Sequence, residues 1–346
     1  MSQAISDKHA RSSPEVDGNS AQGKEENEWL RRLLRATVFG KSPCNAYLRL
    51  NEALWKRLPW SISASRPMRL YGNFIHRIVR ARGRAQAFGT FFFRNRPQLE
   101  LIRRLVNQSR KGARFQVAIL GCSTGPEVYS VTGTIRSARP DLELVITAAD
   151  ISEEAVETAK HGIYSLSCAK LGGTAVCEKM SPVEMDEFFK RNGDDVAIKP
   201  WLKEGINWRV EDAGDSKIID SIGRQKLVVA NNFLCHMKPL QAETCLRNIA
   251  RLVEPGGYLF ISGIDLDVRA KVAQDSGWEP VEELLEEIHE GDILRNDWPF
   301  RYFGLEPLDK MKLDWAVRYA AAFRIPENTE TPSIQRASSA FSLSTP

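Results

Sequence analysis

Two patterns of apolar and polar positions divide the chain. From residue 26 to residue 110, apolar side chains recur three and four positions apart with arginines between them, as in EWLRRLLRATVF and LYGNFIHRIVRAR. This spacing is typical of amphipathic helices. From Phe115 onward, short apolar runs alternate with amphipathic segments, which predicts repeated strand, helix and strand units in a parallel sheet. We therefore expect an α/β domain preceded by a small helical unit.

Five apolar runs are each short enough to be a strand buried on both faces. They are FQVAIL (115–120), LELVITAA (142–149), LVVA (227–230), YLFIS (258–262) and RYFGLEP (301–307). The segments PEVYSVTGTIRSA, EEAVETAKHG and QAETCLRNIARLV between them show helical spacing. Residues 165–208 interrupt this alternation, and we expect them to form a lid or small subdomain with a helix and a pair of strands.

The two ends of the chain are poor in large apolar side chains. Residues 1–25 and 326–346 cannot offset the entropy cost of ordering, so we expect disordered tails around a helical domain (26–110) and an α/β domain (111–325). No run approaches the roughly 18 to 20 apolar residues that span a bilayer. The first residues also lack the apolar core of a secretory signal. These features predict a cytoplasmic protein without membrane insertion.

Charge is distributed unevenly along the chain. Residues 31–115 hold 20 Lys or Arg against two acids, whereas the whole chain carries a net charge of +4. This segment favours an acidic partner, although a solvated helical surface has the same composition. The six cysteines form no Cys-x-x-Cys pair, and the histidines show no ligand spacing to them, so we expect neither a metal site nor a disulfide framework.

The loop GCSTGPEVYS (121–130) follows the first predicted strand, at the edge where open parallel sheets bind ligands. Gly121 and Gly125 let the backbone approach a ligand closely. The loop lacks both the lysine of a phosphate-binding P-loop and the Gly-x-Gly-x-x-Gly of a dinucleotide site. Its carboxylate, Glu127, suits a ligand without phosphate. S-adenosylmethionine, which carries an amino acid end and a sulfonium cation, fits this requirement.

Asp150 ends the second predicted strand, in LVITAAD. A carboxylate at this position can accept both hydroxyl protons of a ribose diol. The same residue could instead cap the helix predicted over ISEEAVETA. Taken together with the loop, the position favours the ribose role.

The motifs resemble those of the CheR-type chemotaxis receptor methyltransferases, which are class I S-adenosylmethionine-dependent enzymes. That family shows a Thr-x-Phe-Phe-Arg element, a Gly-Cys-Ser-Thr-Gly loop with Glu and Tyr-Ser after it, Ala-Thr-Asp-Ile, an Arg-Asn-Val-x-Ile-Tyr-Phe strand end and a Pro-Gly-Gly turn. The corresponding segments here are TFFFR (90–94), GCSTGPEVYS (121–130), AADI (148–151), NNFLCHM (231–237) and EPGG (254–257). The resemblance implies a mostly parallel, Rossmann-like seven-stranded sheet with helices on both faces, and S-adenosylmethionine as cofactor.

The resemblance also implies roles for individual residues. Arg94 would meet the carboxylate of the methionine moiety, and Glu127 would bind its amino group. Asp150 would hold the ribose, while Asp212 and Ala213 would lie near the adenine. The implied cofactor-binding set is Thr90, Arg94, Gly121, Ser123, Gly125, Glu127, Asp150, Ile151, Asp212, Ala213 and Asn232.

Two residues depart from the family pattern after the fourth core strand. The family arginine is Asn231 here and the family tyrosine is His236, and both family side chains lie close to the transferred methyl group. Asn231 and His236 are therefore the candidate catalytic residues, and a neutral histidine suits an acceptor that must lose a proton. A packing role for His236 is the alternative. The segment IHEGD (288–292) is either a polar rim of the substrate mouth or a solvated loop.

Three functions are compatible with these features. The first is methylation of an oxygen on a protein carboxylate or a small molecule, with the basic helices guiding an acidic acceptor. The second is RNA methylation, which the arginines and aromatics of residues 31–115 favour. Against it, NNFL lacks the Asn/Asp-Pro-Pro-aromatic sequence of amino-directed base methylation. The third is a non-catalytic regulator that binds S-adenosylmethionine.

Overall fold

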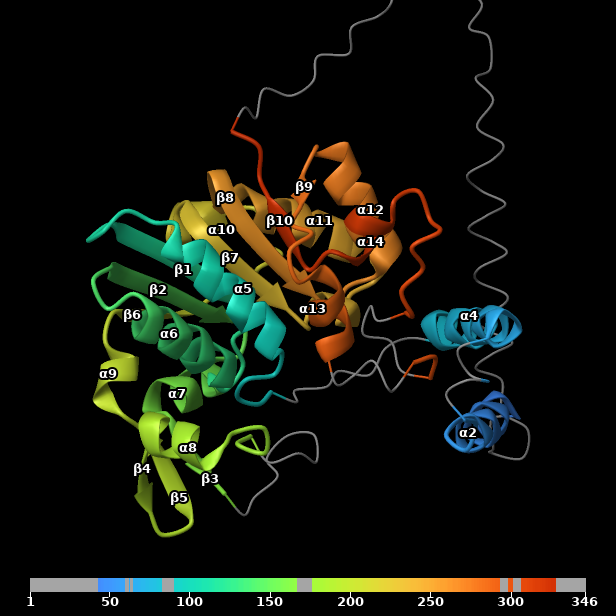
Figure 1. Ribbon diagram of the computed structural model, residues 1–346, viewed down its shortest axis with the longest axis horizontal. Helices are drawn as coiled ribbons and strands as arrows, with labels where there is room; N and C mark the ends of the chain where they lie inside the picture. The colour runs from blue at the N-terminus through green and yellow to red at the C-terminus, as the bar shows by residue number, and fades with distance from the viewer. Residues whose placement is uncertain are drawn as a thin grey trace, which may run out of the picture. The chain divides into compact units, whose positions relative to one another are not determined.

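The computed structural model describes residues 43–59, 62, 65–82, 90–166, 176–292, 298–300 and 306–327 (Figure 1). Contacts divide the chain into two units, Met1–Gly83 and Arg84–Pro346. The domain boundary expected at residue 110 is therefore wrong. The helix α5 (Arg96–Asn107) buries four apolar side chains in the same core as the sheet, which places it in the second unit.

The described part of the first unit includes the helices α2 (Pro43–Trp55) and α4 (Arg66–Arg82). Trp55 stacks on Tyr71 with ring centroids 6.5 Å apart, and the hydroxyl oxygens of Tyr47 and Tyr71 lie 3.0 Å apart. The helix predicted over EWLRRLLRATVF and the two predicted tails, apart from Pro326 and Glu327, lie outside the described residues. The structure therefore describes only part of the helical domain that was predicted at residues 26–110.

The second unit is built on a seven-stranded sheet with the strand order β6-β2-β1-β7-β8-β10-β9. The strands are β1 (Arg114–Leu120), β2 (Glu143–Asp150), β6 (Ile206–Val210), β7 (Gln225–Asn231), β8 (Val253–Ser262), β9 (Glu279–Pro280) and β10 (Ala322–Arg324). The first five strands in the spatial order run parallel, and β10 pairs antiparallel with both β8 and β9. The prediction of a mostly parallel, seven-stranded α/β sheet is confirmed.

Helices cover both faces of this sheet (Figure 1). They are α5, α6 (Pro126–Ala138), α7 (Glu153–His161), α10 (Ile218–Ile222), α11 (Pro239–Arg251), α12 (Leu266–Asp275), α13 (Leu285–Gly291) and α14 (Trp315–Tyr319). Successive side chains of a strand point to opposite faces. In β1, Val117 and Ile119 pack with α5 and α6, whereas Ala118 and Leu120 pack with α10, α11 and α12. This double burial explains the unbroken apolar runs of the central strands.

A small antiparallel sheet forms most of the segment that interrupts the alternation. It contains β3 (Ile163–Ser165), β5 (Asp195–Ile198) and β4 (Phe189–Asn192) in that order, with the short helices α8 (Pro182–Phe188) and α9 (Pro200–Lys203) beside them. Its core is aromatic, with Phe92, Tyr164 and Phe189 in edge contacts. The end of the segment, INWRV, is not part of this subdomain, because β6 pairs with β2 in the large sheet. The lid role stays a prediction.

The edge of the large sheet beyond β8 differs from the prediction, which placed a strand at residues 301–307. Residues 301–305 of the predicted strand RYFGLEP lie outside the described residues, and Glu306 and Pro307 are not in a strand. Instead, β9 and β10 close this edge with two and three residues. None of the described helices is long and apolar enough to cross a bilayer.

Candidate functional site

The loop between β1 and α6 is held tightly by its neighbours. Gly121, Ser123 and Gly125 have φ angles of 66°, 48° and 96°, in the left-handed region that favours glycine. A Cβ atom on Gly121 would lie 2.6 Å from the Phe233 ring, and one on Gly125 would lie 2.9 Å from Cβ of Ala159. The two glycines are therefore required by backbone conformation and by close packing together.

Asp150 joins the end of β2 to this loop. Its Oδ2 accepts a hydrogen bond from the Ser123 backbone N–H at 2.8 Å, and its Oδ1 accepts one from Ser152 N–H at 3.0 Å. Ser152 itself is the N-cap of α7, where its side chain accepts from the Ala155 N–H. The alternative that Asp150 caps this helix is therefore wrong. Each carboxylate oxygen retains capacity for a further donor, such as a ribose hydroxyl. Ile151 beside it is 70% exposed, which leaves an apolar surface at the strand tip.

Glu127, in the first turn of α6, is the centre of a charged and polar cluster. Burial raises the pKa of this carboxyl group, and a hydrogen bond from Asn231 and the charge of Arg94 partly offset the effect. The negative charge of Asp292 raises the pKa further. Asn231 Nδ2 donates to Glu127 Oε1 at 2.7 Å. The structure thus brings together Arg94, Glu127 and Asn231, three residues chosen from the sequence.

Arg94 is carried by the segment that precedes α5. The guanidinium carbon lies 5.4 Å from the centroid of the Phe91 ring. The preceding residue, Phe93, has a φ angle of 51°, and its N–H donates to Ser130 Oγ in α6 at 3.0 Å. This bond ties the TFFFR segment, with the partly buried Thr90 at its start, to the helix that carries Glu127.

The residues after β7 take two different positions. Asn232 adopts a left-handed conformation with a φ angle of 63°, and a Cβ atom on Gly263 would lie 2.6 Å from its Cα atom. The buried Oδ1 atom of Asn232 has no hydrogen-bond partner within the described parts of the chain. His236 ends the short 3-10 turn η1 (Leu234–His236), which leads into α11. Asn231, by contrast, is directed at Glu127.

The turn after β6 places Asp212 and Ala213 at the same edge of the sheet as Asp150, because β6 and β2 are parallel neighbours. Asp212 is exposed, and its Oδ1 accepts the Gly214 N–H at 2.7 Å. Ala213 packs against the apolar core formed with α10 and α11. The carboxyl ends of β1, β2, β6 and β7 therefore define one site, as expected for an open parallel sheet.

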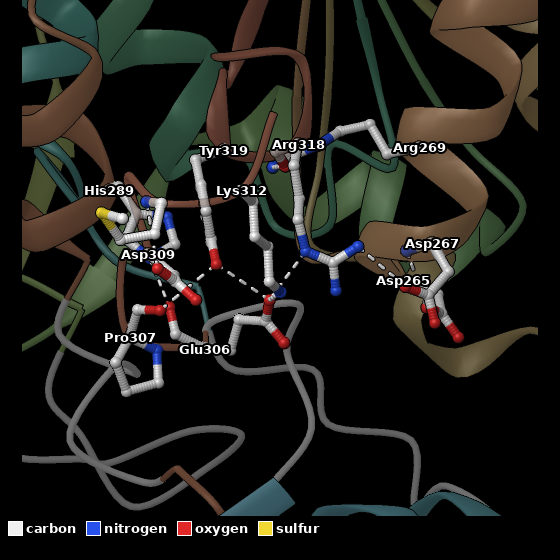
Figure 2. A network of polar contacts seen from close by, with 11 residues as sticks. Asp265, Asp267, Arg269, His289, Glu306, Pro307, Asp309, Lys312, Arg318 and Tyr319 are labelled. Carbon is white, nitrogen blue, oxygen red and sulfur yellow. Dashed lines mark hydrogen bonds and ion pairs between the residues drawn. The ribbon is translucent and has the colours of Figure 1, made fainter. Parts of the chain in front are cut away.

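One residue of the cluster was not predicted. Gln98, at the third residue of α5, is buried and exchanges two hydrogen bonds with Asn231. Asp292, which is also buried, follows α13 and belongs to the segment IHEGD, for which a polar rim was one of the two expectations. The solvated loop considered for IHEGD is wrong, because α13 runs through it and His289 Nε2 lies 2.7 Å from the Glu306 carbonyl oxygen (Figure 2). The apolar spacing in LLEEIHE could have predicted α13 from the sequence. No feature of the local sequence indicates that Gln98 belongs to the site.

The donor set fits S-adenosylmethionine. Arg94 and Glu127 supply opposite charges for an amino acid zwitterion, and Asp150 supplies an acceptor for a diol. The orphaned Asn232 oxygen is a further buried acceptor. Phosphate is disfavoured beside Glu127 and Asp150. Within the described ranges, no three His, Cys, Asp or Glu side chains are grouped to hold a metal ion.

Comparisons with known proteins agree with this fit. The chain is 29% identical over 145 residues to a chemotaxis protein methyltransferase of Vibrio parahaemolyticus, covering 40% of this chain and 50% of that protein. It is 27% identical over 180 residues to a chemotaxis protein methyltransferase of Vibrio anguillarum, covering 50% and 62%. The chain thus spans about half the length of these curated relatives.

Among solved structures, the N-methyltransferase NodS from Bradyrhizobium japonicum WM9 is similar with a TM-score of 0.33 and 14% identity, covering 67% of this chain and 96% of that one. A likeness at this level says nothing about substrate or mechanism. The model of one family, the CheR methyltransferase, SAM binding domain, matches residues 89–266, slightly more than half of the chain. The chain therefore belongs to the CheR methyltransferase family, and residues 89–266 are its S-adenosylmethionine-binding domain.

Proposed function

We propose that this protein is a methyltransferase that transfers the methyl group of S-adenosylmethionine to an oxygen of a protein carboxylate or of a small-molecule acceptor. The observation that carries the proposal is the cluster of Arg94, Glu127 and Asn231 at the sheet edge that also holds Asp150. The names of the Vibrio relatives, chemotaxis protein methyltransferases, support a protein acceptor.

Within this proposal, Arg94 binds the methionine carboxylate beside Thr90, and Glu127 binds the ammonium group. Asp150 accepts the ribose hydroxyls, while Ile151 and Ala213 flank the adenine. The loop supports these contacts through the backbone of Gly121, Ser123 and Gly125. Asp212 also lies near the adenine, and Asn232 offers its buried side-chain oxygen as a further acceptor.

The bound cofactor supplies an electrophilic methyl group on a sulfonium, and its displacement neutralises charge. The chain therefore contributes mainly position and exclusion of water. Asn231 was a candidate catalytic residue, but both its amide hydrogens are directed at Glu127 and Gln98. We therefore assign Asn231 to the cofactor side of the site, where it holds Glu127.

His236 remains our candidate for the acceptor side. An acceptor hydroxyl must lose a proton during transfer, and a neutral imidazole suits this task near neutral pH. A carboxylate acceptor is already ionised and needs no base. The His236→Gln variant should therefore lose most turnover with a hydroxyl acceptor while it retains cofactor affinity. Full turnover at neutral pH would remove His236 from the mechanism.

The acceptor class is tested by incubating the protein with methyl-labelled S-adenosylmethionine and fractionated lysate. We expect label in protein or small molecules, and base-labile label in protein would identify a methyl ester. Label in RNA, together with a steep loss of binding as salt increases, would favour the RNA methyltransferase instead. Cofactor binding without labelling of any fraction would favour a non-catalytic regulator.

A further inference from the structure

Gln98 and Asn231 form a closed pair of amides between α5 and the end of β7. Gln98 Nε2 donates to Asn231 Oδ1 at 3.4 Å, and Asn231 Nδ2 donates to Gln98 Oε1 at 3.3 Å. Both side chains are buried. Each bond is long, but a buried amide that loses its partner leaves polar atoms without hydrogen bonds.

This amide pair fixes the orientation of the Asn231 side chain. An amide has two N–H donors and one carbonyl oxygen. Asn231 uses one N–H for Gln98 and the other for Glu127 Oε1, while its oxygen accepts from Gln98. An Asn231 amide turned by half a rotation would place its carbonyl oxygen against the Glu127 carboxylate. With Gln98 in its present orientation, that turn would also set oxygen against oxygen and N–H against N–H within the amide pair.

The backbone that carries Gln98 is itself held by two elements. Asn95 is the N-cap of α5, and its Oδ1 accepts the Gln98 N–H at 3.2 Å. The Asn95 Nδ2 group donates to the Ile288 carbonyl oxygen in α13 at 2.7 Å. A Cβ atom on Gly291 would lie 3.2 Å from the Pro97 ring, so α13 also packs closely on this turn. Gln98 is therefore presented from a rigid position.

We infer that Gln98 is a positioning residue of the cofactor site: it orients the Asn231 amide, which in turn holds Glu127 for the ammonium group of S-adenosylmethionine. The inference rests on the proposed function, because it needs Glu127 to bind that group. Asn231 donates to Oε1 of Glu127, and we assign the other carboxylate oxygen, Oε2, to the ammonium.

The effect has a signature in the pH dependence of cofactor binding. Burial, and to a smaller extent Asp292, raise the pKa of Glu127, whereas Asn231 and Arg94 partly offset this increase. Ammonium binding requires the ionised carboxylate, so the affinity should increase as pH rises through this pKa. Loss of the Asn231 hydrogen bond should move that increase to higher pH. Loss of Gln98 should also move the increase in affinity to higher pH, but by a smaller amount than loss of the Asn231 hydrogen bond.

The test is a double-mutant cycle on the full chain, with the dissociation constant for S-adenosylmethionine measured by calorimetry at several pH values. We expect Asn231→Leu to weaken binding about tenfold and Gln98→Leu about threefold, from the usual strength of buried hydrogen bonds. The double variant should bind no more weakly than Asn231→Leu alone, since Gln98 acts through Asn231. Additive losses, or unchanged binding and pH dependence in Gln98→Leu, would overturn the inference.

Gln225→Leu is the matched control, because Gln225 is another buried glutamine at the opposite end of β7, where it donates to the Ile222 carbonyl oxygen. This variant should lower the Tm without changing the binding constant or its pH dependence. Gln98→Glu keeps the size of the side chain but removes its N–H donors, and it should also weaken binding if Gln98→Leu does not fold. If the wild-type chain does not bind the cofactor, the proposed function fails; wild-type binding with an unaffected Gln98 variant contradicts the inference alone.

Discussion

Glu127 shows how single residues in this site balance opposing effects. Burial raises the pKa of its carboxyl group, whereas the Asn231 N–H and the Arg94 charge lower this pKa and favour the carboxylate. An ammonium group that binds beside Glu127 should lower the pKa of this carboxyl group further, because a nearby positive charge favours the ionised form.

Replacing Glu127 with Gln should reduce the affinity for S-adenosylmethionine by about 10-fold to 100-fold, since a hydrogen bond to a charged group contributes about 1.5–3 kcal/mol. The free energy of unfolding should change little or increase, because a neutral amide is less costly to bury than a carboxylate. Calorimetric titration checks the affinity and urea denaturation checks the stability. Glu157→Gln, on the outer surface of α7, is the control and should leave the affinity unchanged.

Wild-type affinity for the cofactor should depend on pH in a defined direction. The pKa of Glu127 is raised above the ordinary 4.5, so part of the protein carries a neutral Glu127 in mildly acidic solution. Affinity should therefore increase as pH rises from below 4.5 toward neutrality, and this increase should be absent from Glu127→Gln. An identical pH profile in the two proteins would show that Glu127 does not meet the cation.

At the scale of elements, the sequence predicted the parts whose signals are local. The helix predicted over PEVYSVTGTIRSA has the bounds of α6, because Pro126 suits a first turn and the apolar spacing is helical. The strands β9 and β10 contain two and three residues, too few for any periodicity, and they form only by pairing with each other and with β8. The loop glycines were recognised from sequence, whereas Gln98 was not, because its role depends on a contact 133 residues away.

The close packing around Gly125, in the loop between β1 and α6, predicts a loss of stability when a side chain is added there. Gly125→Ala should destabilise the protein by about 2–4 kcal/mol, since it combines a strained backbone with a Cβ atom 2.9 Å from Cβ of Ala159. Gly193→Ala is the control, because Gly193 has a φ angle of 62° and no atom within 4 Å of the added Cβ. That variant should lose only about 1–2 kcal/mol from backbone strain. Urea denaturation measures both, and equal losses would exclude a packing contribution at Gly125.

At the scale of the whole second unit, a polar network around Glu306 connects the segment before β10 to the neighbouring helices (Figure 2). The Oε1 atom of Glu306 accepts from Arg318 Nε at 2.7 Å, from the Tyr319 hydroxyl at 3.0 Å and from Lys312 Nζ at 3.1 Å. Arg318 also donates to Asp267 in α12 at 2.8 Å. Since His289 in α13 contacts the Glu306 carbonyl oxygen, the network joins α12, α13 and α14 to the segment that leads into β10.

Because of this network, the free energy of unfolding should depend on pH, and the substitution Glu306→Gln should remove this dependence. Burial would raise the pKa of Glu306, but Arg318 and Lys312 outweigh it and lower the pKa below 4.5. A carboxyl group with a lowered folded-state pKa contributes stability above the unfolded value, and loses it as pH falls through the folded value. Glu306→Gln should therefore cost about 2–4 kcal/mol at pH 7, because it leaves Arg318 partly buried without its main partner.

The difference between wild type and Glu306→Gln should shrink as the pH is lowered below 4.5, since the wild-type carboxylate is then lost as well. Urea denaturation at a series of pH values measures this difference. Glu286→Gln is the matched control: Glu286 pairs with Lys310 at 2.7 Å, but both side chains are about half exposed, so the loss should stay below about 1 kcal/mol at every pH. A pH-independent loss in Glu306→Gln would mean that packing, and not charge, holds this segment in place.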